Sequence, residues 1–201
     1  MTDIRFYRSL LIINGMVPLV LLSWDGYHGQ LGANPVEFVL RTAGVLTLVY
    51  LLLTLAITPL RHSLGINELI KFRRLLGLFA FFYGCLHLVT YIVFDRGLSP
   101  TGTVADVIQR PFIAIGMASF FMLVPLAITS TNAMVKRLGG KTWRRLHRLT
   151  YLAAIGGVIH FWMIVKSDIF YPAIFGLVLA VLLGWRIFSS LRKFSTAKIE
   201  R

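Results

Sequence analysis

Three histidines lie inside apolar stretches of the sequence, where an imidazole is costly unless something binds it. His87 is in one stretch, and His147 and His160 are thirteen residues apart in another. Ionisable side chains within membrane segments face the bundle interior, pair with another group and mark a functional site. Axial ligation of a haem iron is one chemistry that needs such histidines, and proton or ion transfer is another.

The composition is that of an integral membrane protein. Of the 201 residues, 57% are hydrophobic and 14% are charged, with a mean hydropathy of +0.75, whereas soluble domains carry about 25% charged residues. Most of the six apolar runs approach the ~20 residues that cross a bilayer as a helix. These runs are residues 9–24, 38–59, 75–94, 111–129, 147–165 and 169–188. We therefore predict one all-α domain over residues 1–201, a bundle of six transmembrane helices.

The boundaries of the spans follow from local signals. The first run resembles the core of a signal peptide, but no small-residue cleavage site follows it, so we expect an uncleaved span. Pro59 is expected to end the second span because proline lacks a backbone N–H. A short surface helix is expected around residues 104–109, and Pro111 suits the first turn of the fourth span. Residues 133–146 are expected to form the longest inner loop.

The net charge of +13 is distributed unevenly between the two sides. If both termini are cytoplasmic, the outer side keeps four of the 21 basic residues and the inner side holds the other 17. The four are Arg41, Arg96, Arg110 and Lys166. This asymmetry follows the positive-inside rule and predicts cytoplasmic termini. The charge therefore reports orientation and attraction to anionic lipid, and it does not indicate a nucleic-acid partner.

The predicted topology places His87 and His160 at the same depth. The third and fifth spans both run outward; His87 follows Arg74 by thirteen residues, and His160 follows His147 by the same number. At 1.5 Å per residue both histidines lie ~20 Å from the inner face. Two facing imidazoles at one level could hold a haem iron from both sides. Such six-coordinate iron suits electron transfer because no position stays open for a substrate.

Near the inner face, His147 has no histidine opposite it. Arg73 and Arg74 occupy the third span at that depth. Arginine stays protonated and is not an iron ligand, but it binds propionate or phosphate through paired hydrogen bonds. Two interpretations are open. His147 binds a second haem with an unusual or missing second ligand, or it lines a cofactor pocket.

An ideal helix would not bring His147 and His160 to one face. Thirteen residues at about 3.6 per turn rotate the side chains by roughly 140°. The pair Gly156-Gly157 lies between the two histidines and could change the phase through a kink or bulge. The sequence leaves this question open.

The chain shares several short motifs with a known family, and the motifs are specific only when they are taken together. The chain resembles the MsrQ family, also called YedZ, the haem-binding membrane subunits of a bacterial periplasmic protein-methionine-sulfoxide reductase system. The resemblance runs from about Gly29 to Trp185. Its motifs are Leu31-Gly32-Ala33-Asn34-Pro35-Val36, Ile57-Thr58-Pro59-Leu60, Arg73-Arg74-Leu75-Leu76-Gly77-Leu78, Leu86-His87-Leu88, Arg110-Pro111, Thr129-Ser130-Thr131, Leu146-His147 and Ile159-His160.

The resemblance implies a ferric-reductase-like transmembrane domain in the bacterial inner membrane. It implies one or two b-type haems on His87, His147 and His160, together with FMN. The electrons would come from the quinone pool or a cytoplasmic flavin reductase. The acceptor would be a periplasmic molybdopterin subunit that repairs oxidised methionine. The wider group has two histidines on each of spans three and five, and this chain departs from that pattern at Arg73 and Arg74.

We therefore expect transmembrane electron transfer, with His87 and His160 on an outer haem and His147 at an inner cofactor. A basic inner rim would hold propionates or flavin phosphate; it consists of Arg73, Arg74, Arg144, Arg145 and Arg148. Substrate chemistry would occur on the partner, so whether the chain itself is an enzyme is left open. The alternative is a small transporter or channel that uses the histidines as proton or ion sites. A structural scaffold without a cofactor is a third possibility.

Overall fold

The computed structural model describes residues 4–165 and 167–199, and this part of the chain contains helices and no strand. Lys166, one of the four cations predicted outside, is not among the described residues. The longer helices are α1 (Ile4–Tyr27), α2 (Pro35–Leu64), α3 (Arg73–Thr90), α5 (Pro111–Ile128), α8 (Leu149–Ile164) and α9 (Phe170–Ile199). The shorter ones are η1 (Asn67–Lys71), η2 (Tyr91–Asp95), α4 (Pro100–Gln109), α6 (Asn132–Leu138) and α7 (Gly140–Leu146).

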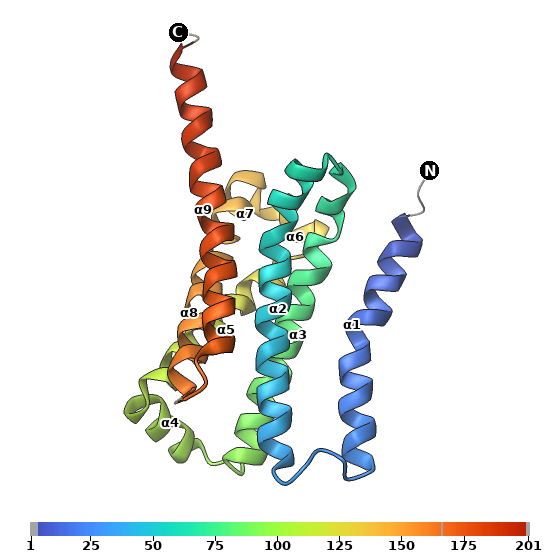
Figure 1. Cartoon of the computed structure of the whole chain (residues 1–201), viewed down its shortest axis with the longest axis vertical. Coiled ribbons are helices and arrows are strands. Elements are labelled where there is room, and N and C mark those ends of the chain that lie inside the picture. Colours follow the sequence, from blue (N-terminus) through green and yellow to red (C-terminus); the bar gives the residue numbers. More distant parts are fainter. Residues whose placement is uncertain (1–3, 166, 200–201) are drawn as a thin grey trace.

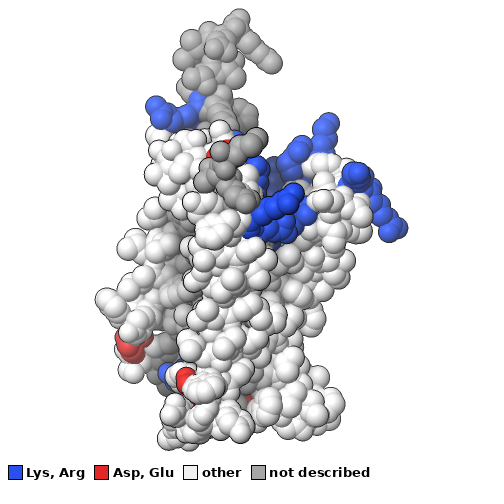
Figure 2. All heavy atoms as spheres, turned by 90° about the vertical axis from the view of Figure 1, so that its right-hand side faces the viewer, with Lys and Arg blue, Asp and Glu red and all other residues white. Residues whose placement is uncertain are grey.

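The long helices form a bundle with two different ends (Figure 1). The main packed pairs are α2 with α3 and α5 with α8, and α9 packs against both α2 and α8. One end carries α6 and α7, the start of α1 and the end of α9, and we call it the basic end. The opposite end carries α4, and we call it the α4 end. Lys and Arg side chains gather at the basic end on the face shown in Figure 2.

The prediction of an all-α integral membrane protein is confirmed. Five segments are long and apolar enough to cross a membrane: Ile4–Tyr27, Pro35–Leu64, Asn67–Asp95, Pro111–Ile128 and Phe170–Arg192. The remaining predicted span corresponds to α8, which is apolar but only 16 residues long. Six spans, a single domain and cytoplasmic termini therefore stay predictions.

Two predicted boundaries are wrong. The second span does not end at Pro59, because α2 continues to Leu64. Proline removes the helical hydrogen bond to the carbonyl of Leu55, but that carbonyl accepts from Nη2 of Arg186 over 2.9 Å instead. The true stop is Gly65, which has a φ of 70° at the C-cap. Glycine adopts this left-handed conformation readily. The predicted loop over residues 133–146 contains α6 and α7, which meet at Gly139. The predicted surface helix is confirmed as α4, and α5 begins at Pro111.

The first helix is fastened to the bundle at one close contact. The hydroxyl of Tyr83, which is fully buried on α3, donates a hydrogen bond of 2.6 Å to the carbonyl of Gly15 on α1. The Phe79 ring occupies the space that a Cβ on Gly15 would need. Tyr50 of α2 stacks on both rings, with centroid distances of 5.2 Å to Phe79 and 5.6 Å to Tyr83. Small residues allow such close helix approaches in membranes.

Replacing Gly15 by Ala should therefore destabilise the protein, because the added methyl group overlaps the Phe79 ring. We expect a loss of about 1–3 kcal/mol, the usual cost of overpacking a core. Gly184→Ala is the matched control, since a Cβ there meets no atom within 4 Å. Midpoints of thermal unfolding for the purified proteins in detergent measure the difference. Equal midpoints for the two variants would show that the α1–α3 contact is not tightly packed.

Candidate functional site

His87, in the last turn of α3, and His160 of α8 lie beside each other near the α4 end. Their ring centroids are 6.1 Å apart and the ring planes are nearly perpendicular, at 88°. Both side chains are half-buried. The predicted proximity of these two residues is thus found in the structure, although they lie on helices far apart in sequence.

The two imidazoles are held in the same way. Nδ1 of His87 lies 2.9 Å from the carbonyl oxygen of Leu40 on α2. Nδ1 of His160 lies 2.6 Å from the carbonyl oxygen of Phe112 on α5. A carbonyl only accepts hydrogen bonds, so each Nδ1 carries the proton and donates it. In its neutral form, each ring therefore keeps a lone pair on Nε2, the nitrogen on the other side of the ring.

Glycines allow both rings to approach the neighbouring helices. Gly44, one turn after the carbonyl acceptor on α2, would place a Cβ 3.1 Å from Nδ1 of His87. Gly116, one turn after the acceptor on α5, would place a Cβ 2.7 Å from Nδ1 of His160. Both helix pairs therefore use the same arrangement: a carbonyl, a glycine four residues later, and a histidine from the partner helix.

This geometry fits a metal held between two imidazoles. A metal–nitrogen bond of about 2 Å on each side, plus the distance from nitrogen to ring centre, gives a centroid separation of roughly 6 Å. Metal-binding histidines usually donate their other N–H to a carbonyl or carboxylate, which fixes the ring and raises its basicity. The described residues contain no cluster of three or more His, Cys, Asp or Glu that could hold a metal. A metal at this pair would therefore need its remaining ligands from other groups, which a macrocycle could supply.

The backbone changes its winding directly after His87. The π-helix η2 (Tyr91–Asp95) continues α3, and turns of this kind are frequent at functional sites. The hydroxyl of Tyr91 donates to the buried carboxylate of Asp106 on α4 over 2.7 Å, and Arg96 pairs with the same carboxylate at 2.9 Å. Helix α4 is thereby fastened close to the paired histidines. The sequence analysis did not single out Asp106.

His147 lies at the basic end, in the connection between α7 and α8, and not at the level of the pair. Its Nε2 is 3.2 Å from the hydroxyl of Thr129, and its ring stacks on Trp143 with a centroid distance of 3.9 Å. The indole N–H of Trp143 donates to the carbonyl of Thr129 over 2.9 Å. Burial and the nearby charges of Arg73 and Arg74 lower the pKa of His147 to about 4. The ring is therefore neutral near pH 7.

The five predicted rim arginines all lie at the basic end. Arg73 is half-buried at the start of α3, and Arg74 donates to the side-chain oxygen of Asn132 over 2.7 Å. The other three, Arg144, Arg145 and Arg148, are exposed. The structure thus brings Arg73 and Arg74 within electrostatic range of His147, while the other three lie on the surface.

The glycine pair in α8 serves packing. Helix α8 is continuous from Leu149 to Ile164. A Cβ on Gly157 would lie 2.8 Å from a methyl group of Leu48 on α2, and one on Gly156 would overlap the hydroxyl of Ser119 on α5. His147 precedes the helix, so the phase of a single ideal helix does not relate it to His160.

One cation that the sequence analysis counted only among the 17 inner-side charges links three helices. Arg186 of α9 donates from Nη1 to the hydroxyl of Tyr151 over 2.6 Å and from Nη2 to the carbonyl of Leu55 over 2.9 Å. It thereby links α9 to α8 and α2. The signal was present, because Arg186 is the only charged residue in the apolar run 169–188.

The apolar helices and a family match together identify a transmembrane component of the ferric-reductase type. The family described as "Ferric reductase like transmembrane component" matches residues 41–158, from α2 into α8. The apolar helices and this family place the chain in the bacterial inner membrane as a multi-pass protein. Membrane electron transfer follows from membership of this family.

Curated relatives give a narrower assignment. A protein of Herminiimonas arsenicoxydans is 50% identical over 195 residues, covering 96% of this chain and 89% of the relative. A protein of Ralstonia nicotianae is 47% identical, with 92% and 86% covered, and one of Bordetella pertussis is 45% identical, with 95% and 93% covered. All three are named "Protein-methionine-sulfoxide reductase heme-binding subunit MsrQ". The chain belongs to the MsrQ family.

The two glycines beside the histidines should differ in their tolerance of a side chain. Gly116→Ala should destabilise the protein more than Gly44→Ala, because its Cβ would lie 2.7 Å from the imidazole instead of 3.1 Å. Overpacking of this kind costs about 1–3 kcal/mol. Thermal unfolding of both variants, beside the neutral Gly184→Ala, measures the order. The reverse order would contradict the closer approach of His160 to α5.

Proposed function

We propose that the chain transfers electrons through a b-type haem whose iron is held by Nε2 of His87 and Nε2 of His160. The observation that carries this proposal is the pair itself, two imidazole rings 6.1 Å apart with both Nδ1 atoms donating to carbonyls. The names of the relatives, which describe haem-binding subunits, support the same cofactor. Bis-histidine iron has no open position for a substrate, which suits electron transfer.

The residues of the chain would orient and insulate this haem. The carbonyls of Leu40 and Phe112 fix the ring orientations and keep the proton on Nδ1, which leaves Nε2 free for iron. Gly44 and Gly116 set how close each ring lies to its supporting helix. The haem supplies one-electron chemistry, while the protein supplies ligation, orientation and a dry medium.

We further propose that electrons move from the basic end to the α4 end. The positive-inside rule supports a cytoplasmic basic end, both termini on that side and six spans that include α8. The donor would be the quinone pool or a cytoplasmic flavin reductase. The acceptor would be a periplasmic molybdopterin-containing subunit that reduces methionine sulfoxide, and the relatives' names support such a partner. Substrate chemistry would then occur on that partner.

His147 is proposed to border or ligate a second cofactor, either another b-type haem or FMN. Its neutral ring is compatible with ligation, but its Nε2 would first have to leave the Thr129 hydroxyl. Arg73 and Arg74 would lie against propionate or phosphate groups of that cofactor, because guanidinium groups bind such anions through paired hydrogen bonds. The exposed Arg144, Arg145 and Arg148 would complete the rim.

The pairing predicts the outcome of single substitutions. His87→Ala and His160→Ala should each remove the same low-spin haem signal, because each deletes one of two ligands of one iron. The measurement is the visible spectrum and the haem-to-protein ratio of the purified protein. His28→Ala is the control, since His28 is exposed and bonds to its own turn through the carbonyl of Trp24.

Loss of two different haems from the two variants would contradict the shared iron. A correctly folded wild-type protein that stays colourless when haem is abundant would favour the transporter or channel instead.

A further inference from the structure

Arg186 is a half-buried cation, and no acidic side chain among the described residues pairs with it. Its two terminal nitrogens are engaged by the neutral Tyr151 hydroxyl and the Leu55 carbonyl, at 2.6 Å and 2.9 Å. Its Nε is buried and has no hydrogen-bond partner among the described residues. The guanidinium also lies 5.0 Å from the centre of the Tyr151 ring. Every partner of Arg186 that the structure describes is therefore neutral.

The surroundings add positive charge. Arg73 lies within electrostatic range of Arg186. At the basic end the only acidic residue in the described part of the chain is Glu68, which is exposed on η1. A charge within a membrane segment is costly unless it is paired or hydrated. Among the residues that the structure describes, the charge of Arg186 therefore has no acidic partner, and a bound anion could balance it.

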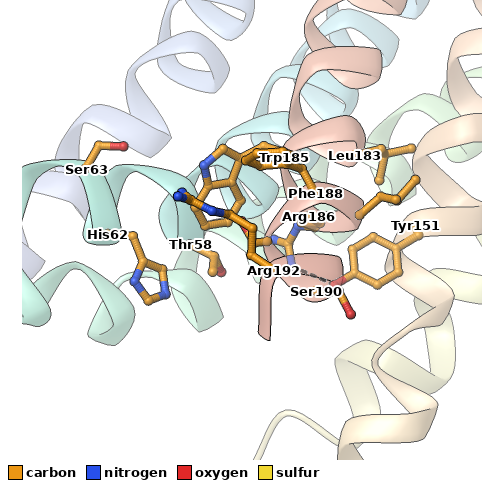
Figure 3. A pocket seen from close by; sticks show the side chains of 12 residues that line it. Thr58, His62, Ser63, Tyr151, Leu183, Trp185, Arg186, Phe188, Ser190 and Arg192 are labelled. Atoms are coloured by element: carbon orange, nitrogen blue, oxygen red, sulfur yellow. Dashed lines mark hydrogen bonds between the residues drawn. The ribbon is translucent and has the colours of Figure 1, made fainter. Parts of the chain in front are cut away.

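A large open pocket beside Arg186 offers the space for such an anion (Figure 3). Its volume is about 1090 Å³, and it lies between the last turns of α2 and the α9 segment around Arg186. Hydroxyl and imidazole groups on one side face aromatic rings on the other. Its lining includes Thr58, His62, Ser63, Tyr151 and two cations, Arg186 and Arg192. His62 and Trp185 have ring centroids 5.6 Å apart.

We propose that this pocket binds an anionic phosphate ester, with Arg186 as its principal cationic contact. Guanidinium groups bind phosphate oxygens through strong, directional hydrogen bonds. The pocket favours an acidic phospholipid, because Ile187 and Phe188 on its rim are 64% and 58% exposed and offer apolar surface to acyl chains. Basic pockets between helices on the cytoplasmic side commonly bind acidic lipid headgroups. The same phosphate chemistry could come from a soluble phosphorylated compound. This inference does not depend on the proposed haem.

Lipid retention by the full-length protein tests the proposal. Protein purified in detergent is mixed with equal amounts of phosphatidylglycerol and phosphatidylcholine, and native mass spectrometry counts the lipid that stays bound. We expect the wild type to retain phosphatidylglycerol preferentially. Arg186→Gln should weaken this retention roughly tenfold, since a charged hydrogen-bond donor is lost. Arg186→Lys should recover part of it, because it keeps the charge without the planar fork.

The control is Arg61→Gln, which removes a cation from the same end. Arg61 bonds to Asn67 over 2.9 Å and does not line the pocket, so its loss should leave lipid retention unchanged. Circular dichroism of each variant checks that α9 keeps its helix, because Arg186 also ties α9 to α2. If Arg186→Gln does not fold, Arg186→Lys and the lipid preference of the wild type decide the question.

A second arm distinguishes the source of the phosphate. Quenching of flavin fluorescence compares flavin mononucleotide, which carries a phosphate, with riboflavin, which does not. If Arg186→Gln weakens only mononucleotide binding and leaves lipid retention intact, the pocket binds a soluble phosphate ester. Wild-type protein that prefers neither anionic ligand, or Arg186→Gln protein that keeps both, overturns the proposal.

Discussion

The orientation of the paired histidines depends on two hydrogen bonds, from Nδ1 of His87 and of His160 to backbone carbonyls of neighbouring helices. Each bond fixes a ring orientation and a tautomer, and each leaves Nε2 available. A Cβ at Gly116 would force the His160 ring to shift, and one at Gly44 would crowd the His87 ring at 3.1 Å. The same close contacts therefore pack the helices and orient the candidate metal ligands. They join Gly44 to His87 and Gly116 to His160.

The sequence was informative where the number of residues between two positions determines how far apart they lie along a helix. The constant rise of a helix was enough to place His87 and His160 at one level, and the structure brings their rings together. The end of α2 was misjudged at Pro59 because Arg186 of α9 satisfies the Leu55 carbonyl that the proline leaves unpaired, while Gly65 ends the helix. The carbonyl partners, the packing role of Gly156-Gly157 and the neutral partners of Arg186 depend on neighbouring helices, which no local pattern reveals.

The two ends of the bundle differ in whether their charges have partners of opposite sign. At the α4 end, the buried carboxylate of Asp106 is matched by Arg96 at 2.9 Å and Arg110 at 3.4 Å. At the basic end, Arg73, Arg74 and Arg186 have no comparable carboxylate among the residues that the structure describes. Positive charge without internal compensation is suited to anionic cofactors and lipid headgroups. Burial lowers the pKa of His147, and the nearby Arg73 and Arg74 lower it further, so its ring stays neutral near pH 7.

The central claim is that two imidazoles bind one iron through Nε2. Pulsed electron paramagnetic resonance of the oxidised protein, with histidine labelled by ¹⁵N at Nε2 alone, tests it most directly. Our account predicts strong couplings to two equivalent labelled nitrogens on one low-spin centre, and weak ones from the Nδ1 positions when these carry the label instead. A centre with one coordinated histidine nitrogen, or strong coupling from Nδ1, would contradict it.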